Sequence, residues 1–177
     1  MELNHSAAAE MAQRYFRTTD PLERLGWGIG GYVYLSPHNR TAVKVHRREE
    51  GFQRELEVYR RLRRLRIMQL HGLAIPKLRG HQADVKLIEM DFVNAPFLLD
   101  FAGVRFTPPE IEFDRETLEH WHASIADFFG PNAHIAYAVY NSLAAHGLYY
   151  VDFRPTNLKL DGLPGLQPFD PSDVGDL

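Results

Sequence analysis

A glycine-rich stretch followed at once by β-forming residues constrains the fold of this chain more than any other feature. Gly26, Gly28, Gly31 and Val33 form the pattern G-x-G-x-x-G-x-V. A dinucleotide-binding fingerprint would need a helix directly after the glycines, whereas residues 32–35 favour a strand. We therefore expect a hairpin whose backbone amides can approach phosphate oxygens, because glycine puts no side chain in the way. A plain glycine-rich hairpin without a ligand is the alternative.

A lysine inside an apolar segment is the second constraint. Lys44 lies in the run Ala-Val-Lys-Val at residues 42–45, which has the composition of a strand. Burying an unpaired ammonium group is costly, so Lys44 needs an anion nearby. Glu55 or Glu57, on the helix expected next, can supply the carboxylate, and the lysine can then reach phosphate groups. The alternative is an edge strand with Lys44 pointing into water.

The order of expected elements indicates an α+β fold with a β-rich half before a helical half. An N-terminal helical extension occupies residues 1–21, a β-rich lobe residues 22–93, and a mostly helical lobe residues 94–177. Hydrophobic periodicity predicts helices, and β-forming runs bounded by turn residues predict strands. The predicted helices are 5–17, 49–70, 115–128 and 131–146, and the extended segments are 32–35, 41–45, 76–80, 85–93, 148–151 and 157–160.

Composition excludes several classes of protein. The 177 residues include no cysteine, which excludes disulfide frameworks and thiolate metal sites. The net charge of −3 argues against nucleic acid as a partner, since nucleic-acid-binding domains are usually strongly basic. No apolar run approaches the roughly 18 residues of a membrane span, and the N-terminus lacks a secretory signal pattern. We expect a cytoplasmic protein with neither a membrane nor a nucleic acid as partner.

The first half resembles the N-lobe of the protein kinase-like superfamily. The resemblance rests on the glycine pattern, the A-V-K on the next strand and the glutamate-bearing helix after it. It implies that Glu55 is the partner of Lys44 and that residues 87–93 form the hinge strand, with Met90 as gatekeeper. By this resemblance the nucleotide-binding residues are Gly26, Gly28, Gly31, Val33, Ala42, Lys44, Glu55, Met90, Asp91 and Val93.

The second half resembles the catalytic loop of the same superfamily. Asp152 and Asn157 keep the spacing of the H-R-D-x-x-x-x-N motif. The resemblance implies that Asp152 accepts the proton of the acceptor hydroxyl, with Lys44 and Arg154 as further catalytic residues and Arg154 facing the γ-phosphate. It also implies that Asn157 and Asp170 bind Mg²⁺ and that ATP is the phosphoryl donor.

The sequence also departs from the kinase pattern. Tyr150 and Val151 stand where the motif has histidine and arginine, and D-F-G is replaced by Asp-Pro-Ser from Asp170. The chain ends at Leu177 without an activation segment or A-P-E motif, so we expect a truncated C-lobe of a compact, atypical kinase. Three interpretations follow: a compact phosphotransferase, a pseudokinase that serves as a nucleotide-binding or protein-interaction module, or a shortened product of a larger kinase.

The expected function is ATP- and Mg²⁺-dependent transfer of the γ-phosphoryl group to a hydroxyl. Protein Ser or Thr is the acceptor by family default, a small molecule is the rival, and the acceptor or protein partner itself is unknown.

Two other features of the sequence say less about function. Many arginines lie between residues 47 and 66, and they form either a solvated helix surface or a docking face for an acidic partner, RNA or a membrane surface. His120 and His122 are two apart, so they lie on different helix faces and do not favour a zinc pair.

Overall fold

The computed structural model describes residues 3–169 and divides the chain into two compact units. The first unit comprises residues 1–68 and 76–93, and the second comprises residues 69–75 and 94–177. The first is built on an antiparallel sheet and the second is mostly helical, which confirms the predicted α+β class. Residues 69–75 belong to the second unit although the sequence places them within the β-rich half.

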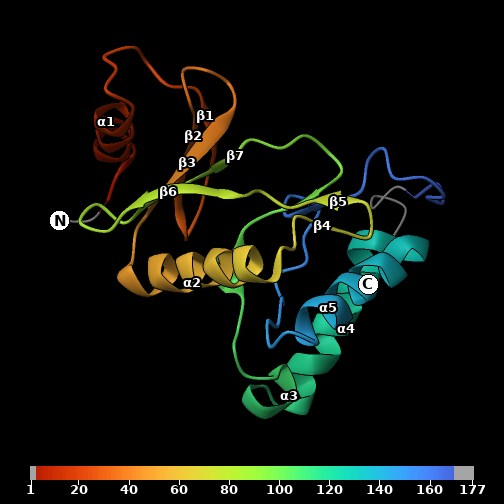
Figure 1. The fold of residues 1–177 in the computed structure, drawn as a ribbon. Helices are drawn as coiled ribbons and strands as arrows, with labels where there is room; N and C mark the ends of the chain where they lie inside the picture. The colour runs from red at the N-terminus through yellow and green to blue at the C-terminus, as the bar shows by residue number, and fades with distance from the viewer. Residues whose placement is uncertain (1–2, 170–177) are drawn as a thin grey trace. The chain divides into compact units, whose positions relative to one another are not determined.

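The first unit contains a five-stranded antiparallel sheet with the order β1-β2-β3-β7-β6 (Figure 1). The strands are β1 (Arg24–Trp27), β2 (Gly31–Leu35), β3 (Thr41–His46), β6 (Leu78–Gln82) and β7 (Leu87–Asp91). β3 lies at the centre, where Lys44 pairs in register with Val33 of β2 and Ile88 of β7. A central strand is the best-ordered place for a functional side chain, because both of its edges are hydrogen-bonded.

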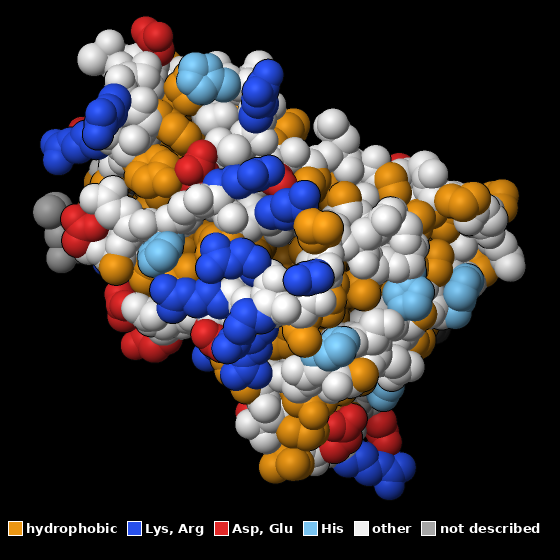
Figure 2. Space-filling model, viewed as in Figure 1, with side chains coloured by type: hydrophobic (Ala, Val, Ile, Leu, Met, Phe, Trp, Pro, Cys, Tyr) orange, Lys and Arg blue, Asp and Glu red, His pale blue; other side chains and the backbone are white. Residues whose placement is uncertain are grey.

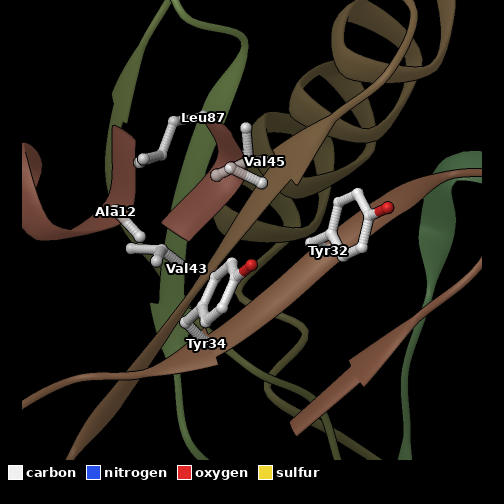
Figure 3. Packing of buried hydrophobic residues seen from close by; sticks show 7 residues of the cluster. Ala12, Tyr32, Tyr34, Val43, Val45 and Leu87 are labelled. Atoms are coloured by element: carbon white, nitrogen blue, oxygen red, sulfur yellow. The ribbon is translucent and has the colours of Figure 1, made fainter. Parts of the chain in front are cut away.

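Two helices cover opposite faces of this sheet. α1 (His5–Phe16) packs against β2 and β3, and α2 (Glu49–Leu65) packs against β3, β6 and β7. Successive residues of a strand point to opposite faces, so Val43 and Val45 face α1 while Lys44 and His46 face α2. Figure 3 shows Val43 and Val45 gathered with Leu87 beside Ala12 of α1. All of β3 after Thr41 is therefore buried.

The helix that the sequence presents as an N-terminal extension is part of the core. Ala8 and Ala12 of α1 are fully buried, and their small side chains let the helix lie close to the sheet. The Tyr15 hydroxyl donates to Glu89 of β7 at 2.9 Å. At the helix start, the side chain of Asn4 accepts a hydrogen bond from the Ala7 amide at 2.9 Å and caps the first turn.

α2 ends five residues before the predicted position 70. Arg66 adopts a left-handed conformation (φ 58°) and its amide donates to the Arg63 carbonyl, which closes the helix. The next residues form a hairpin of β4 (Gln69–Leu70) and β5 (Leu73–Ala74). His71 and Gly72 both have positive φ, as a two-residue hairpin turn requires. Apolar residues between 67 and 70 continue the helical period, which is why the sequence predicts a helix up to residue 70. The hairpin turn at His71 and Gly72 favours two short strands there.

The second unit combines a small sheet with helices. The sheet has the order β4-β5-β8-β9, with β8 (Phe97–Leu98) and β9 (Leu158–Lys159). The helices are η1 (Phe101–Gly103), α3 (Pro109–Glu112), α4 (Arg115–Phe129), η2 (Gly130–Asn132) and α5 (Ala133–Ala144). The helix predicted at 131–146 is therefore shorter, because Pro131 lies in η2 instead of the first turn of α5. Within residues 3–169, no helix combines the length and apolar character needed to cross a membrane.

Candidate functional site: a buried lysine–glutamate pair and a polar loop

The glycine pattern forms the hairpin between β1 and β2. Gly28 and Gly31 close a two-residue turn, with the Gly28 amide 2.9 Å from the Gly31 carbonyl and the reverse pair at 3.3 Å. Gly31 has φ +150°, and a Cβ there would lie 2.1 Å from the Val45 carbonyl oxygen, so the close approach of β3 requires glycine. At the tip, a Cβ on Gly30 would lie 3.7 Å from Lys44 Nζ. The hairpin thus folds over the end of the lysine side chain.

Lys44 is buried and paired with Glu55 of α2. Lys44 Nζ lies 2.8 Å from Glu55 Oε2, and the two side chains are 6% and 1% exposed. Of the two glutamates that the sequence offers as partners, Glu57 instead pairs with Arg61 and Arg64 on the surface of α2. α2 turns Glu55 inward because it lies on the buried stripe with Phe52, Leu56, Tyr59 and Leu62.

His46 is a third side chain at the Lys44–Glu55 pair, and it was not predicted from the sequence. His46 Nε2 lies 2.7 Å from the same Glu55 Oε2, while Glu55 Oε1 has no hydrogen-bond partner among the described residues. Burial by itself would raise the pKa of Glu55, but the Lys44 ammonium and the His46 ring outweigh burial and lower this pKa to about 2. Glu55 is therefore ionised at neutral pH. The spacing Lys-x-His places both side chains on one face of the strand. This spacing could have identified His46 as a neighbour of Lys44.

The expected hinge lies at the end of β7. Ala42 and Met90 are paired in register and buried, and the Tyr59 hydroxyl lies 3.0 Å from Met90 Sδ. The Asp91 amide donates to the Lys77 carbonyl at 3.0 Å, and the Phe92 amide donates to the Arg40 carbonyl at 2.9 Å. The Asp91 side chain pairs with Arg79. Of the backbone amides from Asp91 to Val93, only that of Val93 has no backbone acceptor among the described residues.

The expected catalytic loop follows α5 in the second unit. Asn157 Nδ2 donates to Asp152 Oδ2 at 3.0 Å and to the Asp152 carbonyl at 3.1 Å, so the two motif residues hold each other. Asp152 Oδ1 lies 2.8 Å from Arg154 Nε, and the two side chains are 34% and 66% exposed. Arg154, which the resemblance directs at a phosphate, is thus paired with Asp152. All three side chains come from one short loop.

Three residues anchor this loop where the H-R-D histidine and arginine are missing. Tyr150 is 1% exposed and its hydroxyl donates to the Leu99 carbonyl at 2.6 Å. The Leu99 amide donates to the Asn157 carbonyl at 2.8 Å, so Leu99 joins both ends of the loop. Trp121 of α4 donates its indole N–H to the Val151 carbonyl at 2.8 Å. The sequence marks Tyr150 only as a departure from the motif, and nothing local singles out Leu99 or Trp121.

Only one of the two expected metal ligands, Asn157, lies within the described residues. Asp170 lies outside the described residues, and residues 3–169 contain no group of three His, Asp or Glu side chains placed to hold a metal ion. The chemistry of the available donors does fit Mg²⁺, because Asp152 and Asn157 supply carboxylate and amide oxygens from half-buried positions on one loop. His122, one of the two histidines that the sequence does not favour as a zinc pair, contacts Tyr137: its Nδ1 lies 3.1 Å from the Tyr137 hydroxyl.

Comparison with known proteins gives structural matches only. No protein-family profile matches the chain, and no curated protein matches it in sequence. Among solved structures, the gentamicin complex of APH(2″)-IIa matches at 18% identity with a TM-score of 0.38, covering 73% of this chain and 36% of that chain. The streptomycin–ATP–APH(2″)-IIa ternary complex matches at 18% identity with a TM-score of 0.37, covering 73% and 37%. The chain thus spans little more than a third of either protein.

The geometry of the described residues supports the predicted class. A glycine hairpin over a central-strand lysine, with that lysine paired to a glutamate of the next helix, is the arrangement of a kinase N-lobe. The second unit adds a helical body with an Asp–Asn loop of catalytic-loop spacing. The described residues therefore form an α+β fold, with an antiparallel-sheet unit and a mostly helical unit whose local geometry resembles that of a kinase N-lobe and catalytic loop.

Proposed function

We propose that this chain is a phosphotransferase that uses ATP and Mg²⁺ and delivers the γ-phosphoryl group to a hydroxyl. The observation that carries the proposal is the buried Lys44–Glu55 pair beneath the tip of the glycine hairpin. Burying two charges is costly and is weak evidence for stability, so a ligand-binding role explains the pair better than packing does. An ammonium held in this way presents a fixed positive charge to a phosphate group.

Each polar residue has a role in this proposal. Lys44 binds phosphate oxygens and the hairpin amides contribute further hydrogen bonds. When bound, ATP supplies the transferable phosphoryl group and Mg²⁺ offsets its negative charge. Asn157 and Asp170 would hold Mg²⁺ through oxygen atoms, and Met90 and Val93 would line the adenine site. The use of ATP makes the cytoplasm the expected compartment.

Asp152 is the proposed acceptor of the hydroxyl proton. Its Oδ2 is oriented by Asn157 and its Oδ1 is held by Arg154. The Arg154 side chain is two-thirds exposed, and an exposed ion pair contributes at most about 1 kcal/mol, so Oδ1 can exchange this partner for a hydroxyl. Arg154 is then available to a phosphate oxygen. Asp152→Ala should leave ATP binding intact and abolish transfer, whereas retained transfer would contradict the role.

Charge favours a cationic small molecule over an acidic peptide as the acceptor. The sequence of the second unit holds 4 Lys and Arg against 12 Asp and Glu, a net charge of −8. Such a surface raises the local concentration of cations and repels anions. A protein Ser or Thr in a basic segment remains the second candidate acceptor, since it satisfies the same charge requirement and is the default of the superfamily.

Thermal unfolding with ATP, in the presence and absence of Mg²⁺, tests the proposal first. ATP at about 100 times its dissociation constant should stabilise the chain by roughly 2.7 kcal/mol, which corresponds to about 5–10 °C for a chain of this size. The shift should require Mg²⁺ and should be lost in Lys44→Met and Asp170→Ala. Lys77→Met, at an exposed lysine of the same unit, is the matched control.

The outcomes separate the competing functions. A Mg²⁺-dependent shift together with ³²P transfer to an acceptor supports the phosphotransferase. A shift without transfer to any acceptor or to water supports the pseudokinase as a nucleotide-binding module. No shift at millimolar ATP would contradict nucleotide binding altogether.

A further inference from the structure

The C-terminal end of α2 combines exposed arginines with exposed apolar side chains. Figure 2 shows Lys and Arg side chains gathered over this helix. Leu65 is 43% exposed and Met68 is 52% exposed, although both are large apolar residues. We call these exposed residues the basic–apolar patch of the first unit, and they are Arg60, Arg63, Arg64, Leu65, Arg66 and Met68.

The positive charge of this patch is only partly compensated within its own unit. Glu57 pairs with Arg61 and Arg64 on the surface of α2. Among residues 3–169, no carboxylate pairs with Arg63 or Arg66. The helix dipole favours basic residues in the last turn, but it gives no reason for apolar side chains to be exposed among them. Charged and apolar side chains that are exposed together are typical of a protein–protein contact.

The start of α4 and the short helix α3 carry the opposite charge in the second unit. The acidic residues of this segment are Glu110, Glu112, Asp114, Glu116 and Glu119. Glu112 pairs with Arg105, and Glu119 pairs with Arg115. Glu110 and Glu116 have no lysine or arginine partner among residues 3–169.

An exposed apolar residue also lies within this acidic segment. Ile111 is 74% exposed and follows Glu110 directly in α3. We call the five acidic residues together with Ile111 the acidic–apolar patch of the second unit. The two patches therefore match in kind, since each has uncompensated charge around exposed apolar side chains, and their charges are opposite.

We propose that the basic–apolar patch of one chain binds the acidic–apolar patch of a second copy of the same chain. Opposite charges steer the two patches together and fix their orientation. Contact would also remove Leu65, Met68 and Ile111 from water, which supplies the apolar centre that a protein interface needs. This association goes beyond the proposed phosphotransferase and does not require a nucleotide.

The charge of the whole chain favours a second copy over the other anionic partners. The second unit has a net charge of −8 and the whole chain has a net charge of −3. RNA or an anionic membrane would attract the basic–apolar patch but repel the rest of the chain. A second copy has no such conflict, because its acidic unit is the surface that binds. Each chain carries both patches, so two copies can make the contact twice or successive copies can join head to tail.

Sedimentation equilibrium of the unmodified full chain without ATP tests the association. We expect a mass above that of a single chain at low salt, and a return to the single-chain mass at high salt, because screening weakens the attraction between the patches. A single-chain mass at every protein and salt concentration would overturn the inference.

Charge reversal on α2 tests the basic–apolar patch, and α1 offers a closely matched control. Arg63→Glu combined with Arg66→Glu should weaken association by at least about tenfold, since like charges then face each other. Arg14→Glu combined with Arg17→Glu changes the net charge equally and should leave association unchanged. Arg14 and Arg63 lie in the last turns of their helices, and Arg17 and Arg66 are both left-handed C-cap residues. Equal weakening by both pairs of substitutions would overturn the inference.

Mixing variants with reversed charges identifies the partner surface. Glu110→Arg combined with Glu116→Arg should weaken association as the Arg63→Glu, Arg66→Glu variant does. An equal mixture of these two variants should associate again, because each then meets a patch of opposite charge. A mixture that stays dissociated while the unmodified chain associates would overturn the inference. Thermal unfolding of each variant shows that it is folded before it is mixed.

The remaining outcome assigns the surface to another partner. A single-chain mass, together with binding to phosphatidylserine vesicles that Arg63→Glu and Arg66→Glu abolish, would overturn the inference in favour of a membrane surface. Failure of the chain to bind ATP would contradict the proposed function and leave the association unaffected, since sedimentation is measured without nucleotide.

Discussion

At the scale of single residues, the carboxylate of Glu55 is the most constrained group in the first unit. Lys44 and His46 both contact its Oε2, and burial makes any loss of its charge or partners expensive. The pKa of Glu55 is lowered from 4.5 to about 2, so the native state holds this charge at a pH where the unfolded chain has lost it. The charge therefore makes stability depend on pH in the acid range.

Acid titration of stability measures this dependence. For a carboxyl with a lowered pKa, the contribution is fully present above about pH 4.5 and is lost as the pH falls toward 2. The loss should be on the order of 3 kcal/mol in the free energy of unfolding. Urea unfolding at intervals between pH 6 and 2 should show this decline, and Glu55→Gln should flatten it. Glu10→Gln, on the exposed face of α1, should retain the full decline.

Two glycines of one motif should respond differently to alanine. A Cβ on Gly31 would lie 2.1 Å from the Val45 carbonyl, so Gly31→Ala must push β2 away from β3 and should cost more than about 2 kcal/mol of stability. Nothing lies within 4 Å of a Cβ on Gly28, so Gly28→Ala should cost less than about 1 kcal/mol. Chemical denaturation of both variants checks the difference, and equal losses would refute the close approach.

At the scale of elements, helices hold the polar groups of both units in place. α1 and α2 enclose the sheet and bury Lys44, while α4 and the segment before η1 hold the loop of Asp152 and Asn157. These contacts join residues far apart in sequence: Tyr15 with Glu89, and Trp121 with Val151. The site in each unit is therefore only as well ordered as the helix packing around it.

Trp121 offers the clearest test of an anchoring element. Trp121→Phe keeps an aromatic ring but leaves the Val151 carbonyl, next to Asp152, without its indole donor. We expect a loss of about 1–3 kcal/mol in stability or transition-state binding, seen as a lower kcat for phosphate transfer with ATP affinity nearly unchanged. Tyr137→Phe, which removes a neighbouring hydroxyl that contacts exposed His122, should leave kcat unchanged. Equal effects of the two substitutions would argue against anchoring.

At the scale of the whole molecule, charge is divided unevenly between the two units. The sequence of the first unit contains 16 Lys and Arg against 11 Asp and Glu, a net charge of +5, whereas the second unit has a net charge of −8. Figure 2 shows Lys and Arg side chains gathered over α2, whose exposed arginines include Arg60, Arg63 and Arg64. Basic residues at the end of a helix are also favourable toward its dipole, which explains much of this cluster without a partner.

The acidic second unit predicts that the acceptor step depends on salt. If a cationic hydroxyl compound is the acceptor, its KM should rise several-fold as ionic strength increases from about 0.05 to 0.5 M, because screening shortens the range of its attraction. A neutral polyol used as a comparison acceptor should show no such increase. Steady-state kinetics at fixed Mg²⁺–ATP measure both, and a preference for acidic Ser or Thr peptides would contradict this prediction.

Much of the fold and of the site could be predicted from local patterns. The glycine spacing, the lysine in an apolar strand and the buried stripe of α2 have short-range causes, so the hairpin, β3 and the α+β class follow from the sequence. The choice of Glu55 over Glu57 came from family resemblance, and the structure has the Lys44–Glu55 pair. The roles of Arg154, Asn157 and Asp170 toward ATP and Mg²⁺ stay predictions.

Tertiary structure decided the features that depend on contacts between distant residues. The sequence presents α1 as an extension, because nothing in residues 5–17 says which surface its two buried alanines cover. His46 has no local signal for its side-chain contacts, which are made with a carbonyl from the turn before β7 and a carboxylate from α2. A residue's pattern determines which face of an element it occupies, whereas its charge and hydrogen bonds depend on what folding brings against that face.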